Sequence, residues 1–177
     1  MSLLPLLYSM DAFAQANLPI YKGYLVNGFQ NYGWASSLNF SATYGGSNCV
    51  SVIDTTNYQA VYFGHADFPT APYRALDFWI NGGPGGGQML QVGGPLDGSP
   101  PAQYSLGQLQ TNVWQHFTVP LSALGIPAAT NCSGFWIQGT VNTAQPVFYV
   151  CGMQLLANPA PSTVHLNVNA ANVIRTA

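Results

Sequence analysis

The stretch Leu76-Asp77-Phe78-Trp79-Ile80-Asn81, followed by a glycine-rich run at 82–87, decides the fold of this 177-residue chain. Its apolar side chains recur at every second position, and successive side chains of a β-strand point to opposite faces of a sheet. Glycine then supplies positive φ and proline ends strand pairing, so the run at 82–87 is a turn. We therefore predict a strand that buries Leu76, Phe78 and Ile80 and turns Asp77, Trp79 and Asn81 to the other face.

Similar short runs recur about every ten residues between Gly23 and Leu156, separated by clusters of Gly, Pro, Asn and Ser. Their β-branched and aromatic content favours strands over buried helices. This pattern is typical of an all-β, two-sheet antiparallel β-sandwich, or jelly roll. The predicted strands are 23–29, 34–41, 49–53, 58–64, 75–81, 88–93, 102–106, 114–120, 134–138 and 147–156.

Charged side chains are scarce, at 5% of the chain, against about 25% in ordinary globular proteins. The 48% of hydrophobic residues is enough for the core of one domain. Nucleic acid is excluded as a partner, because neutralising phosphates needs a basic cluster and the chain has only Lys22, Arg74 and Arg175. No membrane span is expected, because no apolar run approaches about 20 residues.

The two ends of the chain predict segments outside the sandwich. Residues 1–16 are a possible signal peptide or a remnant of one, because Ala14-Gln15-Ala16 is a small-x-small cleavage pattern; a strand is the alternative. Residues 17–156 form the sandwich module, and 157–163, with two prolines, form a linker. Residues 164–177 alternate again, as the start of a following domain or an extra terminal strand. A secreted, extracellular protein is therefore predicted.

The aromatic and amide side chains predicted on the outer face of the sheets point to a binding function. The strand around Phe135 and Ile137 repeats the alternation of 76–81, which turns Trp136 and Gln138 outward. A sugar ring stacks its apolar C–H face on an aromatic ring and pairs its hydroxyls with amides. The alternative is that each tryptophan fills a second layer of core. The predicted ligand-binding face consists of Trp79, Trp136, Gln91, Gln138 and Asn81.

Three further side chains are candidates for the rim of that face: Trp34, Tyr62 and His65. For Trp34, the sequence favours a place in the core and a contact with ligand equally. His65 stands close to Asp67 in the sequence, but such a pair is more often hydrogen-bonded than metal-binding or catalytic. Trp114 is interpreted as structural. However, strand alternation puts it on the same face as the polar residues His116 and Thr118.

Catalysis is poorly supported by the residues. Glycoside hydrolysis usually needs two carboxyl groups about 5 to 9.5 Å apart, and apart from Asp11 in the leader the acidic residues are Asp54, Asp67, Asp77 and Asp97. No Gly-x-Ser-x-Gly elbow occurs. We predict a protein that is not an enzyme and needs no cofactor.

Cys49, Cys132 and Cys151 allow at most one intramolecular disulfide, and the sequence does not show which two pair. Their spacing is unlike that of a zinc motif.

Three segments carry a resemblance to a known family: 73–83, the step from Trp114 through Val119 into 120–125, and Phe148-Tyr149-Val150. On these, residues 22–156 resemble the carbohydrate-binding modules of galactose-binding-like β-sandwich type that are attached to bacterial glycoside hydrolases. The resemblance implies a polysaccharide partner and an attached glycosidase-type domain, to which 164–176 would belong.

The chain departs from that family at the closing strand. Similar modules usually place an acidic pair after the Tyr-Val step, often linked to a structural calcium, whereas this chain has Cys151-Gly152. Calcium prefers carboxylate oxygens, so no metal is expected here. Cys49 and Cys132 also stand where the resemblance implies aromatic or small residues, which suggests that a disulfide replaces the metal as a staple.

The leading hypothesis is non-catalytic binding of neutral polysaccharide through the aromatic and amide-lined face, anchoring an attached enzyme. The alternative is a structural subunit of an extracellular fibre or coat that self-assembles by adding a terminal strand to a neighbour's sheet. A small hydrolase using His65 or Asp67 is a third, weaker hypothesis.

Overall fold

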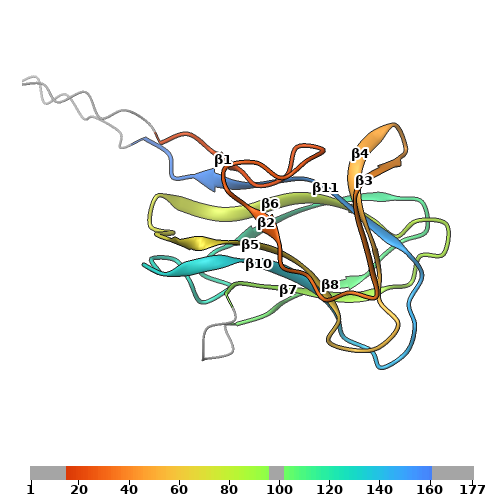
Figure 1. Ribbon diagram of the computed structural model, residues 1–177. Coiled ribbons are helices and arrows are strands. Elements are labelled where there is room, and N and C mark those ends of the chain that lie inside the picture. The colour runs from red at the N-terminus through yellow and green to blue at the C-terminus, as the bar shows by residue number, and fades with distance from the viewer. Residues whose placement is uncertain (1–14, 96–101, 161–177) are drawn as a thin grey trace, which may run out of the picture.

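The computed structural model describes residues 15–95 and 102–160. These residues contain no helix, and their strands form two antiparallel sheets packed face to face (Figure 1). The predicted all-β, two-sheet sandwich is confirmed. No described helix is long and apolar enough to span a membrane.

The first sheet has the strand order β3-β4-β11-β6-β9. A short strand, β1, pairs with the C-terminal half of β11. All its pairs are antiparallel, including the central pair of β11 with β6. Its strands are β1 (Leu18–Pro19), β3 (Ser37–Tyr44), β4 (Ser47–Ile53), β6 (Tyr73–Asn81), β9 (Trp114–Pro120) and β11 (Phe148–Ala157).

The second sheet has the order β2-β5-β10-β7-β8, also antiparallel throughout. Its strands are β2 (Gln30–Asn31), β5 (Ala60–Phe68), β7 (Met89–Gly93), β8 (Tyr104–Gln108) and β10 (Cys132–Gly139).

The core lies between the sheets and follows the alternation of the sequence. Leu76, Phe78 and Ile80 of β6 are fully buried, as are Phe135 and Ile137 of β10. Their neighbours in sequence point to the outer faces of the two sheets, so the predicted inward set is confirmed and the outer faces remain for function.

The predicted strand at 23–29 is wrong. The chain there forms a loop, because Gly23 (φ 83°), Asn27 (φ 54°) and Gly28 (φ 82°) adopt left-handed backbone conformations that a strand excludes. The other predicted strands all have a counterpart, and 114–120 matches β9 at both ends. The segments predicted at 1–14 and at 161–177 lie outside the described residues.

Candidate functional site

The outer face of the first sheet contains two adjoining hollows. The larger has a volume of about 560 Å³, within the range of about 300 to 1,000 Å³ typical of ligand sites. The smaller, of about 240 Å³, shares Lys22 and Gly152 with it and continues past Pro19 and Gln154. We call the two together the groove. The larger hollow is lined by Lys22, Gly23, Ser47, Asn48, Trp79, Trp114, Cys151 and Gly152.

Trp79 is the exposed aromatic platform of the groove. Its indole is 43% exposed although β6 is central in the sheet. His116 is its partner on β9, and the two rings stack with centroids 4.4 Å apart and planes 13° apart. On β11, Gly152 has no side chain, and a Cβ built there would lie 3.9 Å from Cδ1 of Trp79. The ring is thus supported by a neighbour and left open to the groove.

The imidazole that supports Trp79 is itself fixed by a carboxylate. Nε2 of His116 lies 2.9 Å from Oδ1 of Asp77. The Thr118 hydroxyl donates to the same oxygen at 2.6 Å, and the Gln154 amide donates to Oδ2 at 3.2 Å. Asp77 therefore acts as a positioning residue: its carboxylate is occupied by three neighbours and holds the stacked pair in place.

Trp114 forms the other aromatic wall, at the start of β9. It is cross-strand from Asn81, and Tyr44 of β3 meets its ring edge-on with centroids 6.3 Å apart. Tyr44 in turn stacks on Tyr149 of β11 at 4.0 Å. The β3–β4 turn passes close to Trp114, because a Cβ at Gly45 (φ 57°) would be 3.2 Å from the indole nitrogen.

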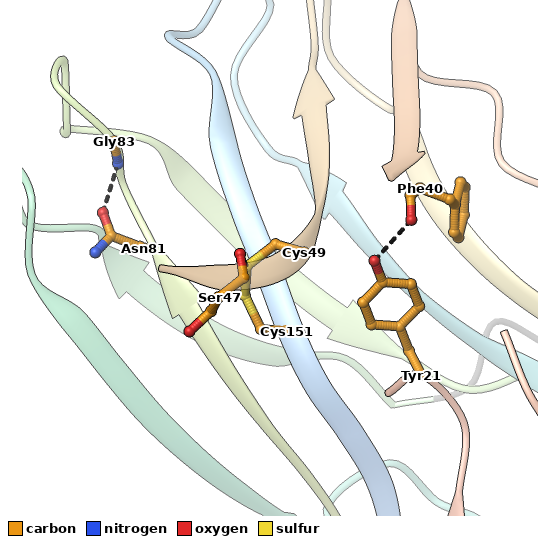
Figure 2. The surroundings of a disulfide bond; sticks show 7 residues. All are labelled: Tyr21, Phe40, Ser47, Cys49, Asn81, Gly83 and Cys151. Carbon is orange, nitrogen blue, oxygen red and sulfur yellow. Dashed lines mark hydrogen bonds between the residues drawn. A yellow bond between two sulfur atoms is a disulfide. The ribbon is translucent and has the colours of Figure 1, made fainter. Parts of the chain in front are cut away.

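The floor of the groove is a disulfide between Cys49 of β4 and Cys151 of β11 (Figure 2). The sequence alone did not show which two of the three cysteines pair. Because Val150 pairs with Val50, the two cysteines are the next cross-strand pair along the ladder. The third cysteine, Cys132, is buried in β10 of the other sheet.

A further part of the groove wall is the loop that contains Lys22 and Gly23. The N–H groups of Ile20 and Tyr21 both donate to Met153 O, at 2.8 and 3.0 Å. The buried Tyr21 hydroxyl donates to Phe40 O at 2.7 Å (Figure 2), and burial raises the pKa of Tyr21 to about 12. The backbone on which Lys22 is carried is therefore firmly anchored.

The predicted common face of Trp79 and Trp136 is wrong. Trp136 belongs to β10, which lies between β5 and β7 in the second sheet. Although it points outward from the core, it is only 2% exposed and packs with Ala60 and Tyr62. Gly93 on β7 makes room for the indole, since a Cβ there would be 2.1 Å from Cζ2. The alternative prediction, that a tryptophan of the outer face fills a second layer of core, is therefore correct for Trp136.

Asn81 is the other predicted residue on the first sheet, and it is only 1% exposed. Its Oδ1 accepts a hydrogen bond of 2.8 Å from Gly83 N, which shapes the turn after β6 (Figure 2).

The amides predicted for the site are on the second sheet and are engaged there. Gln91 donates to Gln138 Oε1 at 2.9 Å, and Gln138 donates to Tyr58 O at 2.9 Å. Trp34, 38% exposed, also donates its indole N–H to Tyr58 O. These contacts hold the loop at Tyr58 against the sheet.

Tyr62 and His65, on β5, have structural partners as well. The Tyr62 hydroxyl lies 3.0 Å from Ser133 Oγ. His65 bonds through Nε2 to Asn27 O at 2.9 Å and contacts Phe29 at a centroid distance of 4.6 Å. The predicted residues are thus divided between two opposite faces of the molecule, with only Trp79 and Asn81 on the face that carries the groove.

Several groove residues were missed at the level of sequence. The parity of Trp114 with His116 and Thr118 was the available signal for its outward position. Lys22 and the disulfide at the groove, and Tyr44 against Trp114, had no such signal, because loops and strand pairings distant in sequence bring them there.

The closing strand does not fit the calcium site that the family resemblance implies. Cys151 is in a disulfide and Gly152 has no side chain, so neither supplies the oxygen ligands that Ca²⁺ requires. Among residues 15–95 and 102–160, no cluster of three metal-ligating side chains occurs.

Comparison with known proteins shows a likeness in structure only. No protein-family model matches the sequence, and no curated protein matches it. Solved structures of one class do share its fold: they are carbohydrate-binding modules. Because the identities are low, this likeness establishes the β-sandwich and not the ligand.

The similar structures include modules of family 11 and family 29. The family 11 module of the cellulosomal cellulase Lic26A-Cel5E of Clostridium thermocellum has a TM-score of 0.57 at 12% identity, covering 81% of this chain and 95% of its own. A variant of the family 29 module CBM29-2 has a TM-score of 0.56 at 14% identity, covering 85% and 98%. Another CBM29-2 variant, complexed with mannohexaose, has a TM-score of 0.54 at 13% identity, covering 79% and 90%.

Replacing His116 with alanine is expected to weaken ligand binding about two- to tenfold without unfolding the protein, because the stacked pair contributes about 0.5 to 1.5 kcal/mol. The Trp79 ring would lose its support but keep its exposure. Titration calorimetry with a ligand of the groove checks this, and Gln115→Ala on the same strand is the control. Equal affinities for the two variants would contradict the role of His116.

Proposed function

We propose that this chain is a non-catalytic carbohydrate-binding module that holds a polysaccharide in the groove of the first sheet. The observation that carries the proposal is an exposed, imidazole-backed Trp79 that faces a hollow of about 560 Å³ with a second indole, Trp114, in its wall. A sugar ring needs such a platform for its C–H face.

The remaining lining supplies the hydrogen bonds that a sugar requires. Ser47 and Asn48 are exposed polar side chains at the edge of β4, within reach of hydroxyls in the larger hollow. The smaller hollow adds Gln154. Two adjoining hollows suit a chain of linked sugars better than a single ring, which favours a polysaccharide with a neutral backbone as the ligand.

The placement of the carboxylates supports a binding role rather than hydrolysis. Asp77 has its oxygens occupied by His116, Thr118 and Gln154. Asp54 is fully buried, and no acidic side chain lines either hollow among the described residues. A glycosidase would need two free carboxyl groups about 5 to 9.5 Å apart across the scissile bond.

The comparisons support the same reading through the fold that this chain shares with modules of families 29 and 11. We extend the proposal to the rest of the chain accordingly: residues 17–156 are the module, 157–163 a linker, and the segment from 164 the start of an attached glycosidase-type domain. The whole protein would be secreted, in keeping with the Cys49–Cys151 disulfide.

Trp79→Ala is expected to weaken polysaccharide binding about ten- to thirtyfold, as the loss of a central aromatic contact does. Affinity gel electrophoresis on β-glucans, xylan and mannan selects a ligand, and calorimetry then measures the affinity. Trp34→Ala is the matched control, because it removes an indole of similar exposure, 38% against 43%, that packs on Tyr62 of the second sheet away from the groove.

Loss of binding in the Trp34 variant with normal binding in the Trp79 variant would move the site to the second sheet. No retardation of the folded parent protein by any glycan would overturn the proposed function.

A further inference from the structure

We infer that the groove selects a polysaccharide whose sugars carry an anionic group, a carboxylate or a sulfate, and that Lys22 is the residue that recognises it. The inference rests on the proposed function and names a substituent on its otherwise neutral ligand. It is carried by the position, the anchoring and the electrostatic surroundings of Lys22.

Lys22 occupies the junction of the site. It lines both the larger and the smaller hollow, a position it shares only with Gly152. A group bound there lies beside a sugar stacked on Trp79 and can be reached from either hollow. A charge at this point acts on the middle of a bound chain rather than on its end.

The backbone at Lys22 is fixed, whereas its side chain is exposed. Tyr21 N donates to Met153 O and Lys22 N donates to Tyr24 O at 2.9 Å. The next residue, Gly23, packs so closely on Asn48 that a Cβ there would be 2.8 Å from Asn48 Cβ. Lys22 therefore lines the groove from a fixed backbone, so that no main-chain ordering cost opposes binding there.

Within the part of the chain that the structure describes, no acidic side chain is paired with Lys22 or lines either hollow. The one contact within ion-pair distance among residues 15–95 and 102–160 joins the His116 imidazole to Asp77 and does not involve Lys22. Asp77, the carboxylate beneath the stacked pair, is only 8% exposed and already has three partners. The groove thus has a positive charge and no exposed negative one, which is complementary to an anionic ligand.

The scarcity of charge elsewhere makes this single ammonium informative. The chain has three Lys and Arg in total and a net charge of −2 at pH 7. The protein as a whole repels polyanions weakly, so a preference for an anionic glycan has to come from the groove and not from a general basic surface.

The test compares pairs of glycans with the same backbone: xylan with and without glucuronic acid side groups, and a galactan with and without sulfate. We expect the parent protein to bind the charged member of at least one pair about two- to fivefold more tightly at low salt. Raising the salt concentration should remove that preference. Which pair responds identifies the anionic group.

Lys22→Gln is expected to reduce the charged-to-neutral affinity ratio to one, and Lys22→Arg to restore it. Arg74→Gln is the matched control, since Arg74 is exposed but lines neither hollow. An equal affinity of the parent protein for both members of each pair, or an unchanged ratio in Lys22→Gln, would overturn this inference and leave the proposed function standing. Binding to no glycan at all would overturn both.

Discussion

A variant without the Cys49–Cys151 disulfide is expected to unfold about 10 °C below the parent protein. The bond joins residues 102 positions apart, so it removes much of the loop-closure entropy of the unfolded chain, a contribution of about 2 to 4 kcal/mol. For a protein of this size, each kcal/mol shifts the Tm by about 2 to 4 °C. The bond also fixes β4 to β11 beneath the groove, so binding should weaken too.

Calorimetry on the Cys49→Ala/Cys151→Ala double variant measures the change. A reductant provides the internal control: it should lower the Tm of the parent protein to that of the double variant and leave the double variant unaffected. A parent Tm that is unchanged after complete reduction, verified by thiol titration, would show that the disulfide does not stabilise the fold.

The second large effect concerns Asp54, which follows β4 and is fully buried. Neither carboxylate oxygen accepts a hydrogen bond of good geometry among the described residues, and the adjacent Gly139 backbone N–H offsets only part of the effect of burial on the Asp54 pKa. A Cβ at Gly139 would be 3.0 Å from Oδ2, so the carboxyl group is packed against the β10 backbone. Burial raises the pKa of Asp54 from 3.8 to about 7.

The sign of the effect follows from proton binding. Between pH 3.8 and about 7, the folded protein holds a proton on Asp54 that the unfolded chain has released. The free energy of unfolding therefore falls as pH rises through this interval, by on the order of 2 to 4 kcal/mol at pH 8 relative to the acid limit. An asparagine at position 54 cannot ionise and removes this dependence.

Asp54→Asn is accordingly expected to be more stable than the parent protein at pH 8 and to lose that advantage toward pH 4. Urea unfolding at several pH values measures the difference in unfolding free energy between the two proteins. The contributions of groups that titrate alike in both cancel in this difference. Asp67→Asn, at an exposed position on β5, should keep the parent's pH dependence. Parallel stability curves for Asp54→Asn and the parent would contradict the buried ionisation.

The alternation of side chains made much of this fold predictable. It identified the faces of β6, β7 and β10 and both ends of β9, because a period of two depends only on local sequence. It was wrong at 23–29, where positive φ at Asn27 and two glycines breaks a pattern that otherwise looks extended.

The site was harder to predict because it depends on which strands are neighbours. Trp79 and Trp136 occupy equivalent places in two similar strands, but those strands belong to different sheets. Whether an outward indole is exposed depends on its neighbours as well: Gly93 leaves room for the buried Trp136 ring, whereas His116 stacks against Trp79 and leaves it exposed. Such pairings arise from contacts distant in the chain.

The placement of β1 and β11 determines how the module responds to pulling. Ala157 N donates to Asn17 Oδ1 at 2.9 Å, and both segments leave the sandwich on the same side (Figure 1). Tension between them would peel the two-residue β1 from β11 one hydrogen bond at a time. Further extension stops at the Cys49–Cys151 crosslink. The span that carries Trp79 and Trp114 lies within the crosslinked loop and is bypassed by the load, whereas Lys22 lies outside it, so tension would release the Lys22 side of the groove before the aromatic side.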